Sequence, residues 1–363
     1  MRIDLDRRVV ALHNGLEESW DALVVAVGSV SHDFGIPGVA EHTLGFKTIV
    51  DAMRLRARVV ELFEMAEQAE GDSQKRRLLS FLIVGGGVTG VEVAAELIEM
   101  ARETLLPRYP SLSASHVSVT VVEYGARVVP AARPAHSEYV RRHLEHSGVR
   151  LELGARVTGV EPRRVRLADG RVLEAFTLLW TAGVRPPDLV RDLPLAHVRD
   201  GRVVVDEFLH AVGPDGNPRG DVFVIGDCAA SARPDGALQP QLSQTAIAMG
   251  AHVGETLVRA ARGEPPRPFR FRDVGYIISL GKHSSVLELF GVPLSGRLAW
   301  LAWAAAYLVK MVGVRKQIEV GLDHLTHLFF DHDTSQILTR RSVLSDDELD
   351  LPLRGEDAEG GGR

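Results

Sequence analysis

Short runs of apolar residues mark the predicted strands of this chain. They cover residues 21–29, 78–84, 117–123 and 221–227, and each ends in glycine or at a small or acidic residue. Such runs are typical of strands buried on both faces of a parallel sheet. Residues 276–280 and 286–290 predict a further pair of strands.

Longer stretches between these runs carry apolar residues at helical spacing. They cover residues 49–69, 91–104 and 244–262. Residues 149–173 predict short strands of an antiparallel insertion. The polar, basic residues 71–77 have the composition of a linker. The alternation of strand and helix patterns favours a doubly wound α/β architecture.

Composition narrows the class of protein. A chain of 363 residues, 45% hydrophobic and 25% charged, is long enough for two or three globular domains. Its net charge of −6 gives no general electrostatic reason to bind nucleic acid, so no nucleic-acid partner is predicted. The single cysteine, Cys228, excludes a disulfide framework and a Cys-rich zinc site in these residues, and no metal site is predicted.

A glycine motif joins the strand at residues 78–84 to the following helix. Its members are Gly85, Gly87 and Gly90. In a dinucleotide-binding unit the first glycine permits a sharp turn, the second lets a pyrophosphate approach the backbone, and the third lets helix and strand pack closely. The helix N-terminus then holds the anion. The motif predicts a dinucleotide site, against the alternative of a glycine turn without a ligand.

Glu123 ends the next predicted strand. There it can accept hydrogen bonds from a ribose 2′-hydroxyl and would repel a 2′-phosphate, which favours NAD over NADP. Its distance from the glycines along the chain exceeds the usual ~20 residues. Residues 107–115 are interpreted as the insertion responsible.

Three further residues are candidates for chemistry. Glu92 is either a first-turn carboxylate that complements the helix dipole or an acid that relays protons beside a cofactor ring. Asp227, after Gly226, lies where open α/β sheets place ligands, with an Asx-turn or capping aspartate as the alternative. Cys228 is interpreted as a packed side chain, since no base or second cysteine lies nearby in the sequence.

These segments occur in the order found in flavoprotein reductases with two dinucleotide domains. The finer pattern resembles the type II NADH dehydrogenases (NADH:quinone oxidoreductases). The motifs that carry this resemblance are Phe-Gly-Ile-Pro-Gly at 34–38, Leu-Trp-Thr-Ala-Gly-Val at 179–184, Val-Ile-Gly-Asp at 224–227 and the helix from Gln244. The resemblance implies a flavoprotein of the respiratory chain that transfers a hydride from NADH to FAD and then two electrons to a membrane quinone, without pumping protons. It also implies a peripheral enzyme on the cytoplasmic face of the cell membrane, and allows a homodimer.

The resemblance also assigns site residues. Glu92 matches the acid near the nicotinamide and flavin rings, and Gln244 matches the glutamine at the quinone end of the flavin; both are candidate catalytic residues. The positions that match cofactor contacts are Gly85, Gly87, Gly90 and Glu123 for NADH, with Ala182 and Gly183 beside them, and Gly28, Gly226 and Asp227 for FAD.

The chain departs from the family pattern at two places. Ala248 and Met249 stand where the family carries a pair of glutamines, so the quinone contacts are less defined than the nucleotide contacts. The family's first glycine fingerprint, which holds the FAD pyrophosphate, would precede Met1. The expected FAD domain is therefore incomplete at its N-terminus.

The C-terminal region carries an uncharged run, residues 298–309, between Arg297 and Lys310. Twelve residues are too few to cross a bilayer, which needs about 20, but the run suits a membrane interface, joined by a second apolar helix at residues 318–330. The alternative is a helix buried against the body of the protein or a dimer partner.

The predicted fold class is therefore α/β, with two Rossmann-like domains, the NAD domain inserted into the FAD domain, and a C-terminal membrane-associated region. The predicted domains are 1–75 and 191–264 for the two parts of the FAD domain, 76–190 for the NAD(H) domain, 265–335 for a strand pair and amphipathic helices, and 336–363 for a partly disordered tail.

Two other functions stay open on sequence grounds. One is a soluble FAD/NAD-dependent reductase of the ferredoxin or rubredoxin type, which would not respond to quinone. The other is a non-catalytic NADH-binding fragment, if FAD does not bind. Sulfide:quinone and thioredoxin reductases need active cysteines that Cys228 alone does not supply.

Overall fold

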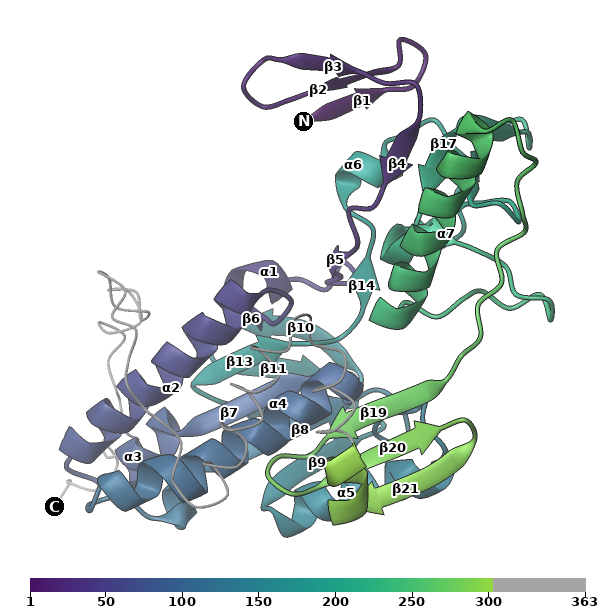
Figure 1. Cartoon of the computed structure of the whole chain (residues 1–363). Helices are drawn as coiled ribbons and strands as arrows, with labels where there is room; N and C mark the ends of the chain where they lie inside the picture. Colours follow the sequence, from purple (N-terminus) through teal and green to yellow (C-terminus); the bar gives the residue numbers. More distant parts are fainter. Residues whose placement is uncertain (303–363) are drawn as a thin grey trace, which may run out of the picture. The chain divides into compact units, whose positions relative to one another are not determined.

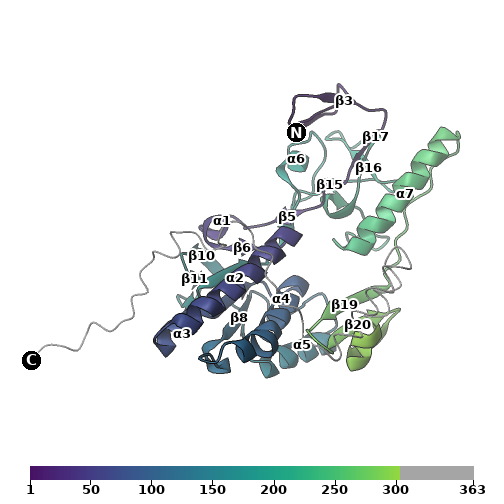
Figure 2. The same cartoon turned by 60° about the vertical axis from the view of Figure 1, so that its left-hand side comes forward.

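The computed structural model describes residues 1–302 (Figures 1 and 2). These residues form two compact units. The first unit comprises Met1–His32 and Gly183–Asp273, and the second comprises Asp33–Ala182 and the described residues from Val274 onward.

A parallel sheet of five strands, in the order β6-β13-β7-β8-β9, forms the centre of the second unit. Alternate residues of β7 point to opposite faces: Phe81 and Ile83 belong to one hydrophobic cluster, and Leu82 and Val84 to another. This confirms the buried parallel strands predicted from the apolar runs. The strands are Leu44–Gly45 (β6), Ser80–Val84 (β7), Ser118–Glu123 (β8), Val149–Leu153 (β9) and Thr177–Trp180 (β13).

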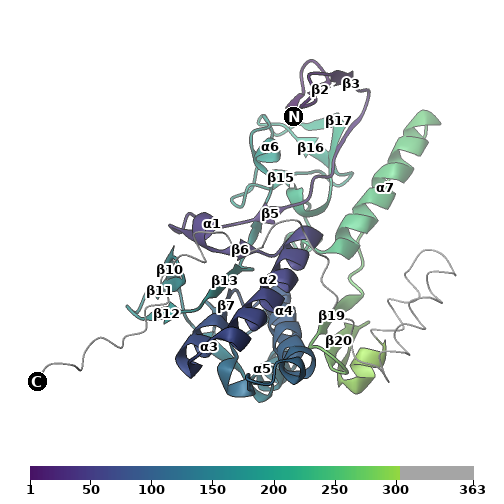
Figure 3. The same cartoon turned by 90° about the vertical axis from the view of Figure 1, so that its left-hand side faces the viewer.

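Helices cover one face of this sheet and a small antiparallel sheet covers the other (Figure 3). On the helical side, Phe63, Val91 and Val140 lie in one hydrophobic cluster with β7. On the opposite side, Val157 and Val165 pack against it. The helices on the helical side are α2 (Ile49–Gln68), α4 (Val88–Glu99) and α5 (Pro134–His146). The opposite side carries the strands β10 (Val157–Glu161), β11 (Arg164–Leu167) and β12 (Val172–Glu174), together with the short helix α1 (Val39–His42), whose Val39 lies in the same hydrophobic cluster.

Helix α2 agrees with the helix predicted over residues 49–69, and a capping box begins it. The Thr48 hydroxyl accepts the N–H of Asp51 at 3.2 Å, and the Asp51 carboxylate accepts the N–H of Thr48 at 2.7 Å. These bonds satisfy backbone groups that the first helical turn leaves without partners.

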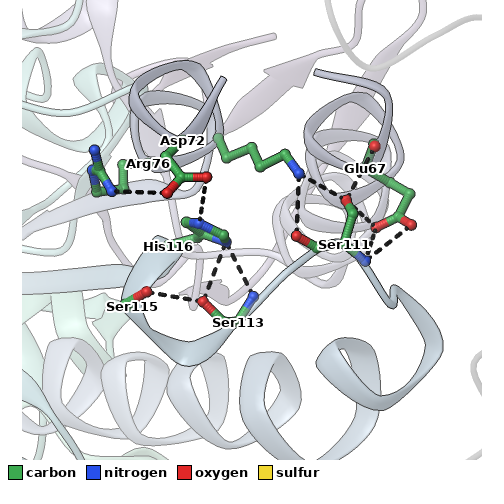
Figure 4. Close-up of polar contacts among 8 residues, drawn as sticks. Glu67, Asp72, Arg76, Ser111, Ser113, Ser115 and His116 are labelled. Atoms are coloured by element: carbon green, nitrogen blue, oxygen red, sulfur yellow. Dashed lines mark hydrogen bonds and ion pairs between the residues drawn. The ribbon is translucent and has the colours of Figure 1, made fainter. Parts of the chain in front are cut away.

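The segment predicted as a linker, residues 71–77, is instead part of helix α3 (Asp72–Leu78). One side of this helix is buried although its residues are mostly polar. Lys75 lies against Ser111 and not in solvent. Lys75 Nζ donates to Ser111 Oγ at 2.9 Å and to its carbonyl at 3.1 Å, and Ser111 Oγ donates to Glu67 Oε2 at 2.9 Å (Figure 4). A basic side chain with such partners is compatible with burial.

The contacts of Ser111 with Lys75 and Glu67 also hold the predicted insertion, residues 107–115, against the second unit. The inserted segment follows a π-helical turn, η1 (Met100–Leu105), and contains the 3₁₀ turns η2 (Leu106–Arg108) and η3 (Ala114–His116). Nδ1 of the buried His116 accepts the N–H of Ser113 at 3.0 Å, and its Nε2 lies 3.4 Å from Asp72 (Figure 4). Both ring nitrogens of His116 therefore have partners within the unit, and the side chain holds the turn at residues 113–116.

A second antiparallel sheet, β19 (Gly275–Ser279), β20 (Ser285–Leu289) and β21 (Val292–Gly296), completes the described part of the second unit. It confirms the strand pair predicted at residues 276–290. Tyr276 anchors it beside α5: its hydroxyl lies 2.8 Å from His136 Nδ1 and accepts the N–H of Arg133 at 3.0 Å. The Arg133 guanidinium also binds the Glu288 carboxylate.

The first unit is built around β17 (Pro218–Val224), which pairs in parallel with β4 (Leu23–Val25) and antiparallel with β16 (His210–Val212). Helix α7 (Ser243–Ala261) packs on it through Met249 and Val253. Both α7 and β4 agree with the predicted elements. The remaining elements are β1 (Arg2–Asp4), β2 (Val9–Ala11), β3 (Glu17–Ser19), β5 (Val30–Ser31), β14 (Val184–Arg185), α6 (Asp188–Arg191), β15 (Val203–Val204), η4 (Gly226–Cys228) and β18 (Ala229–Ala230).

This division differs from the predicted boundaries, which assigned residues 1–75 to the FAD domain and 265–335 to a separate region. Residues 33–75 fold with the five-stranded sheet, because the apolar face of α2 completes its hydrophobic cluster. The described residues 274–302 join the same unit through β19 and β20. Most of the predicted membrane-interface run at 298–309, all of residues 318–330 and the tail lie outside the described residues. Within residues 1–302, no helix is long and apolar enough to span a membrane.

Candidate functional site

The glycine motif forms a tight turn between β7 and α4. Gly85 has φ +112°, and a Cβ there would lie 2.8 Å from the backbone nitrogen of Ala182. A Cβ on Gly90 would lie 1.9 Å from the carbonyl oxygen of Gly85, so only glycine lets the helix approach the strand. Gly87 differs, because a Cβ there would meet nothing within 4 Å and its φ is an ordinary −70°. Two glycines therefore shape the turn, and Gly87 keeps its outer side open.

Helix α4 begins at this turn without a side-chain cap. Gly87 is its N-cap, and no side chain in the described structure accepts a hydrogen bond there. The first N–H groups of a helix have no partners within it, and the helix dipole adds positive charge at the same end. The turn therefore has the donors and the polarity to bind a phosphate or pyrophosphate.

Glu123 lies against this turn, despite the long insertion between them in the chain. Its Oε2 accepts the N–H of Gly86 and its Oε1 accepts the N–H of Gly125, each at 2.6 Å. The carboxylate is thus held at the carboxyl end of β8, beside the glycine turn. The structure brings together the two parts of the predicted nucleotide motif.

Ala182 and Gly183 follow β13, the strand on the other side of β7. Thr181 joins this strand end to the turn: its hydroxyl donates to the carbonyls of Val84 and Gly85 at 3.0 and 3.1 Å. Ala182 is the last residue of this part of the second unit, and Gly183 (φ +68°) begins the next part of the first unit.

Glu92 lies beyond the first turn of α4, so the interpretation as a first-turn partner of the helix dipole is wrong. Its Oε1 accepts the N–H of Ser279 in β19 at 3.0 Å. Burial raises the pKa of Glu92, and the N–H of Ser279 only partly offsets this. The side chain is therefore a partly buried carboxyl with an elevated tendency to hold a proton.

Two further carboxylates, Glu96 and Glu99, follow Glu92 on the same face of α4 and form a carboxylate row with it. The sequence reasoning did not single them out. Glu99 Oε2 accepts the N–H of Lys282 at 2.5 Å, and the exposed side chain of Glu96 lies between the two along the helix. Although part of this side chain is exposed, neighbouring protein atoms reduce the hydration of its carboxyl group. This loss of hydration, together with the charges of Glu99 and Glu92, raises the pKa of Glu96 to about 7. The spacing of Glu92, Glu96 and Glu99 along one helix was the available signal, since such residues share a face.

In the first unit, the carboxyl ends of β4 and β17 bring the predicted flavin-contact residues together. Gly28 and Gly226 both have positive φ, +66° and +72°. Ser29, which the sequence reasoning did not single out, donates from its hydroxyl to Asp227 Oδ2 at 2.6 Å. The missed Gln241 donates from Nε2 to the Asp227 carbonyl at 2.8 Å.

Cys228 is fully buried, and its Sγ donates to the carbonyl of Ile225 at 3.2 Å. Burial raises the pKa of the thiol, which lowers the fraction of reactive thiolate. This agrees with the interpretation as a packed side chain. Within the described residues, no group of three or more His, Cys, Asp and Glu side chains could hold a metal ion.

Gln244 lies in the first turn of α7, where its Nε2 donates to Asp273 Oδ1 at 3.4 Å. Of the two residues that depart from the family pattern, Met249 is buried and its Sδ accepts the N–H of Gly226 at 3.2 Å. Ile247, on the same helix, is 72% exposed. The turn of α7 that follows Gln244 is therefore apolar on its outer side.

Parallel strands that end in glycine turns, one of them bonded to an acidic side chain, define an α/β protein of the Rossmann-like class. A model of the pyridine nucleotide-disulphide oxidoreductase family matches residues 1–250. Ndh, the type II NADH:quinone oxidoreductase of Mycobacterium tuberculosis, is 32% identical over 311 residues, which are 82% of this chain and 65% of that protein. The type II NADH:quinone oxidoreductase of Staphylococcus aureus is 31% identical over 325 residues, which are 88% of this chain and 76% of that protein.

The structure is similar to that of NDH2 from Plasmodium falciparum in complex with NADH, with a TM-score of 0.81 at 16% identity, covering 92% of this chain and 84% of that one. This similarity shows the shared fold. The chain belongs to the pyridine nucleotide-disulphide oxidoreductase family and, within it, to the type II NADH:quinone oxidoreductases. It spans 65% of the length of the M. tuberculosis relative.

Proposed function

We propose that this chain oxidises NADH with a bound FAD and passes two electrons to a membrane quinone. The observation that carries the proposal is the placement of the Glu123 carboxylate 2.6 Å from the N–H of Gly86 in an uncapped glycine turn. This arrangement suits a dinucleotide whose pyrophosphate meets the helix N-terminus and whose ribose hydroxyls face an acid. The names of the relatives, type II NADH:quinone oxidoreductases, support the same reaction.

The charge of Glu123 sets the choice of nucleotide. A carboxylate accepts hydrogen bonds from ribose hydroxyls, whereas the 2′-phosphate of NADPH would bring a second negative charge to the same place. We infer that NADH is the preferred donor.

The ends of β4 and β17 fit the FAD. A Cβ on Gly28 would meet nothing within 4 Å, and one on Gly226 would meet only the Ala246 side chain at 3.4 Å, so the backbone here leaves room for a ligand. Gly28, Gly226 and Asp227 would hold the cofactor, with Ser29 fixing the Asp227 carboxylate. When bound, the flavin supplies the chemistry that accepts a hydride and releases electrons.

Two side chains have proposed roles in the reaction. Glu92, whose pKa is raised by burial, holds or moves a proton as the flavin and quinone change redox state. Gln244 presents an amide that can donate a hydrogen bond to a quinone carbonyl, beside the exposed Ile247 on the apolar side of α7.

We also propose that the enzyme associates peripherally with the cytoplasmic face of the cell membrane through its C-terminal segments, and that it forms a homodimer. The support for membrane association is the uncharged, tryptophan-containing run at residues 298–309 and the hydrophobic acceptor. Cell fractionation with a salt wash tests this proposal, since an interfacial helix would resist removal by salt. Sedimentation of the detergent-solubilised protein tests the dimer.

The absorption spectrum of the purified 363-residue chain, reconstituted with FAD, tests the central proposal. Bound flavin gives near-ultraviolet and visible bands, and NADH should bleach the visible band. Failure of the chain to bind FAD would contradict the proposed reaction and favour the non-catalytic alternative.

Reduction of a soluble quinone analogue then tests the electron acceptor. Gln244→Ala should slow quinone reduction by roughly tenfold, the effect of losing one hydrogen bond to the acceptor, and leave NADH binding unchanged. Gln68→Ala, at an exposed glutamine near the end of α2, is the matched control. A chain that reduces ferredoxin but shows no response to quinone would favour the soluble reductase.

A further inference from the structure

Tyr124 directly follows Glu123 at the carboxyl end of β8, and 74% of its surface is exposed. In the described part of the chain, no residue forms a hydrogen bond or a ring contact with its side chain.

The backbone on both sides of Tyr124 is nevertheless held firmly. The carbonyl of Glu123 accepts the N–H of Ala155, and the carbonyl of Gly125 accepts the N–H of Gly154, each at 2.9 Å. The Glu123 side chain also bonds to the N–H of Gly125 at 2.6 Å. The exposed ring is therefore presented from a fixed backbone and not from a long loop.

The order of the strands shows which half of a dinucleotide reaches this residue. Strands β8 and β13 lie on opposite sides of β7, whose end carries the pyrophosphate turn. Glu123, on β8, faces the ribose that distinguishes NADH from NADPH, and that ribose belongs to the adenosine half. The adenine attached to it lies on the β8 side, away from Ala182 on the β13 side.

We propose that Tyr124 is the adenine-binding residue of this site, with its ring stacked against the adenine of NADH. The inference rests on the proposed binding of NADH to the second unit. Stacking of a base needs an accessible aromatic face, and the exposed ring of Tyr124 provides one from a hydrogen-bonded backbone. Its affinity contribution depends on the ring and not on the hydroxyl.

Calorimetric titration of the purified 363-residue chain with ADP-ribose tests the proposal without requiring turnover or flavin. Tyr124→Ala should weaken binding by roughly five- to tenfold, the lower part of the range for loss of base stacking. Tyr124→Phe should stay within about twofold of wild type, because it keeps the ring. Phe290→Ala, at an exposed aromatic residue elsewhere in the unit, should leave binding unchanged.

A second ligand separates adenine recognition from damage to the fold. Reduced nicotinamide mononucleotide lacks adenine, so wild type and Tyr124→Ala should bind it equally. Equal affinity of wild type and Tyr124→Ala for ADP-ribose would overturn the inference, as would a similar loss for both ligands. If wild type itself fails to bind ADP-ribose, the proposed NADH site fails and the inference fails with it.

Discussion

The hydroxyl of Ser29 lies 2.6 Å from Oδ2 of Asp227, although the two residues are 198 positions apart in the sequence. The contact exists because β4 and β17 run in parallel, with Val25 beside Val224, so that their carboxyl ends meet. The hydrogen bond orients the Asp227 carboxylate, which we propose contacts the flavin cofactor. Gln241 restrains the backbone of the same aspartate.

Loss of the Ser29 hydroxyl should therefore weaken flavin binding. In Ser29→Ala we expect the affinity for FAD to fall by roughly tenfold, because a hydrogen bond to a charged acceptor contributes about 1.5 kcal/mol or more. Ser243→Ala, at an exposed serine of α7, is the control. Flavin fluorescence during titration measures both. Equal FAD affinity in the two variants would show that the carboxylate does not need this partner.

The glycine turn offers two substitutions with opposite expected results. Gly90→Ala should prevent correct folding of the second unit, because its methyl group would lie 1.9 Å from the Gly85 carbonyl oxygen. Gly87→Ala should fold, since the backbone angle is ordinary and the space is empty, with a melting temperature lowered by only about 1–3 °C. The added methyl group should nevertheless weaken NADH binding by roughly tenfold or more, because it occupies the side of the turn that the pyrophosphate approaches. Thermal unfolding and NADH titration measure the two effects; normal NADH affinity in Gly87→Ala would place the nucleotide elsewhere.

Glu123 should determine the preference for NADH over NADPH. Replacement by Gln or Ser removes the charge that repels a 2′-phosphate. The kcat/KM for NADH divided by that for NADPH should therefore fall by roughly tenfold or more. Glu123→Gln also loses one of the two hydrogen bonds to Gly86 and Gly125, because an amide has a single acceptor oxygen. Steady-state kinetics with both nucleotides measure the preference, and an unchanged ratio would show that Glu123 does not face the ribose.

The carboxylate row on α4 should make stability depend on pH. The pKa of Glu96 is raised from an unfolded value near 4.5 to about 7 in the folded protein. Between these values the folded state binds more protons than the unfolded state, so this group lowers the stability of the fold as pH rises from 4.5 to 7. The cost is present in full above pH 7.

Glu96→Gln should remove that cost. We expect the variant to melt about 1–3 °C above wild type at pH 8 and at the same temperature near pH 4, the small size reflecting the exposure of the side chain. Glu70→Gln, at an exposed position after α2, should show no such pH-dependent difference. Unfolding measured by circular dichroism across this pH range checks the prediction, which an equal shift at both pH values would contradict.

Local patterns were sufficient for the elements that carry their own signals. The helical spacing of residues 49–69 matches α2, and the glycines at 85, 87 and 90 form the predicted turn between strand and helix. The prediction of a linker at residues 71–77 was wrong because Lys75 is buried against Ser111. That partner lies on the inserted segment, and composition does not reveal it. Helix α2 likewise packs in a hydrophobic cluster with β7, β8 and β13, strands that come later in the chain, so its place in the second unit depends on distant partners.

The sequence by itself determined the α/β fold class and the glycine turn, because these depend on hydrophobic periodicity and on glycines at fixed spacing within one segment; the family followed from the resemblance of its motifs. Only the tertiary structure decided which distant groups meet: Ser29 with Asp227, Glu123 with Gly86, and Glu92 with the backbone of Ser279. Those contacts depend on strand pairing and on helix packing between residues far apart in the chain. The same packing sets the burial that raises the pKa of Glu92, so its protonation is a property of the folded unit and not of its helix.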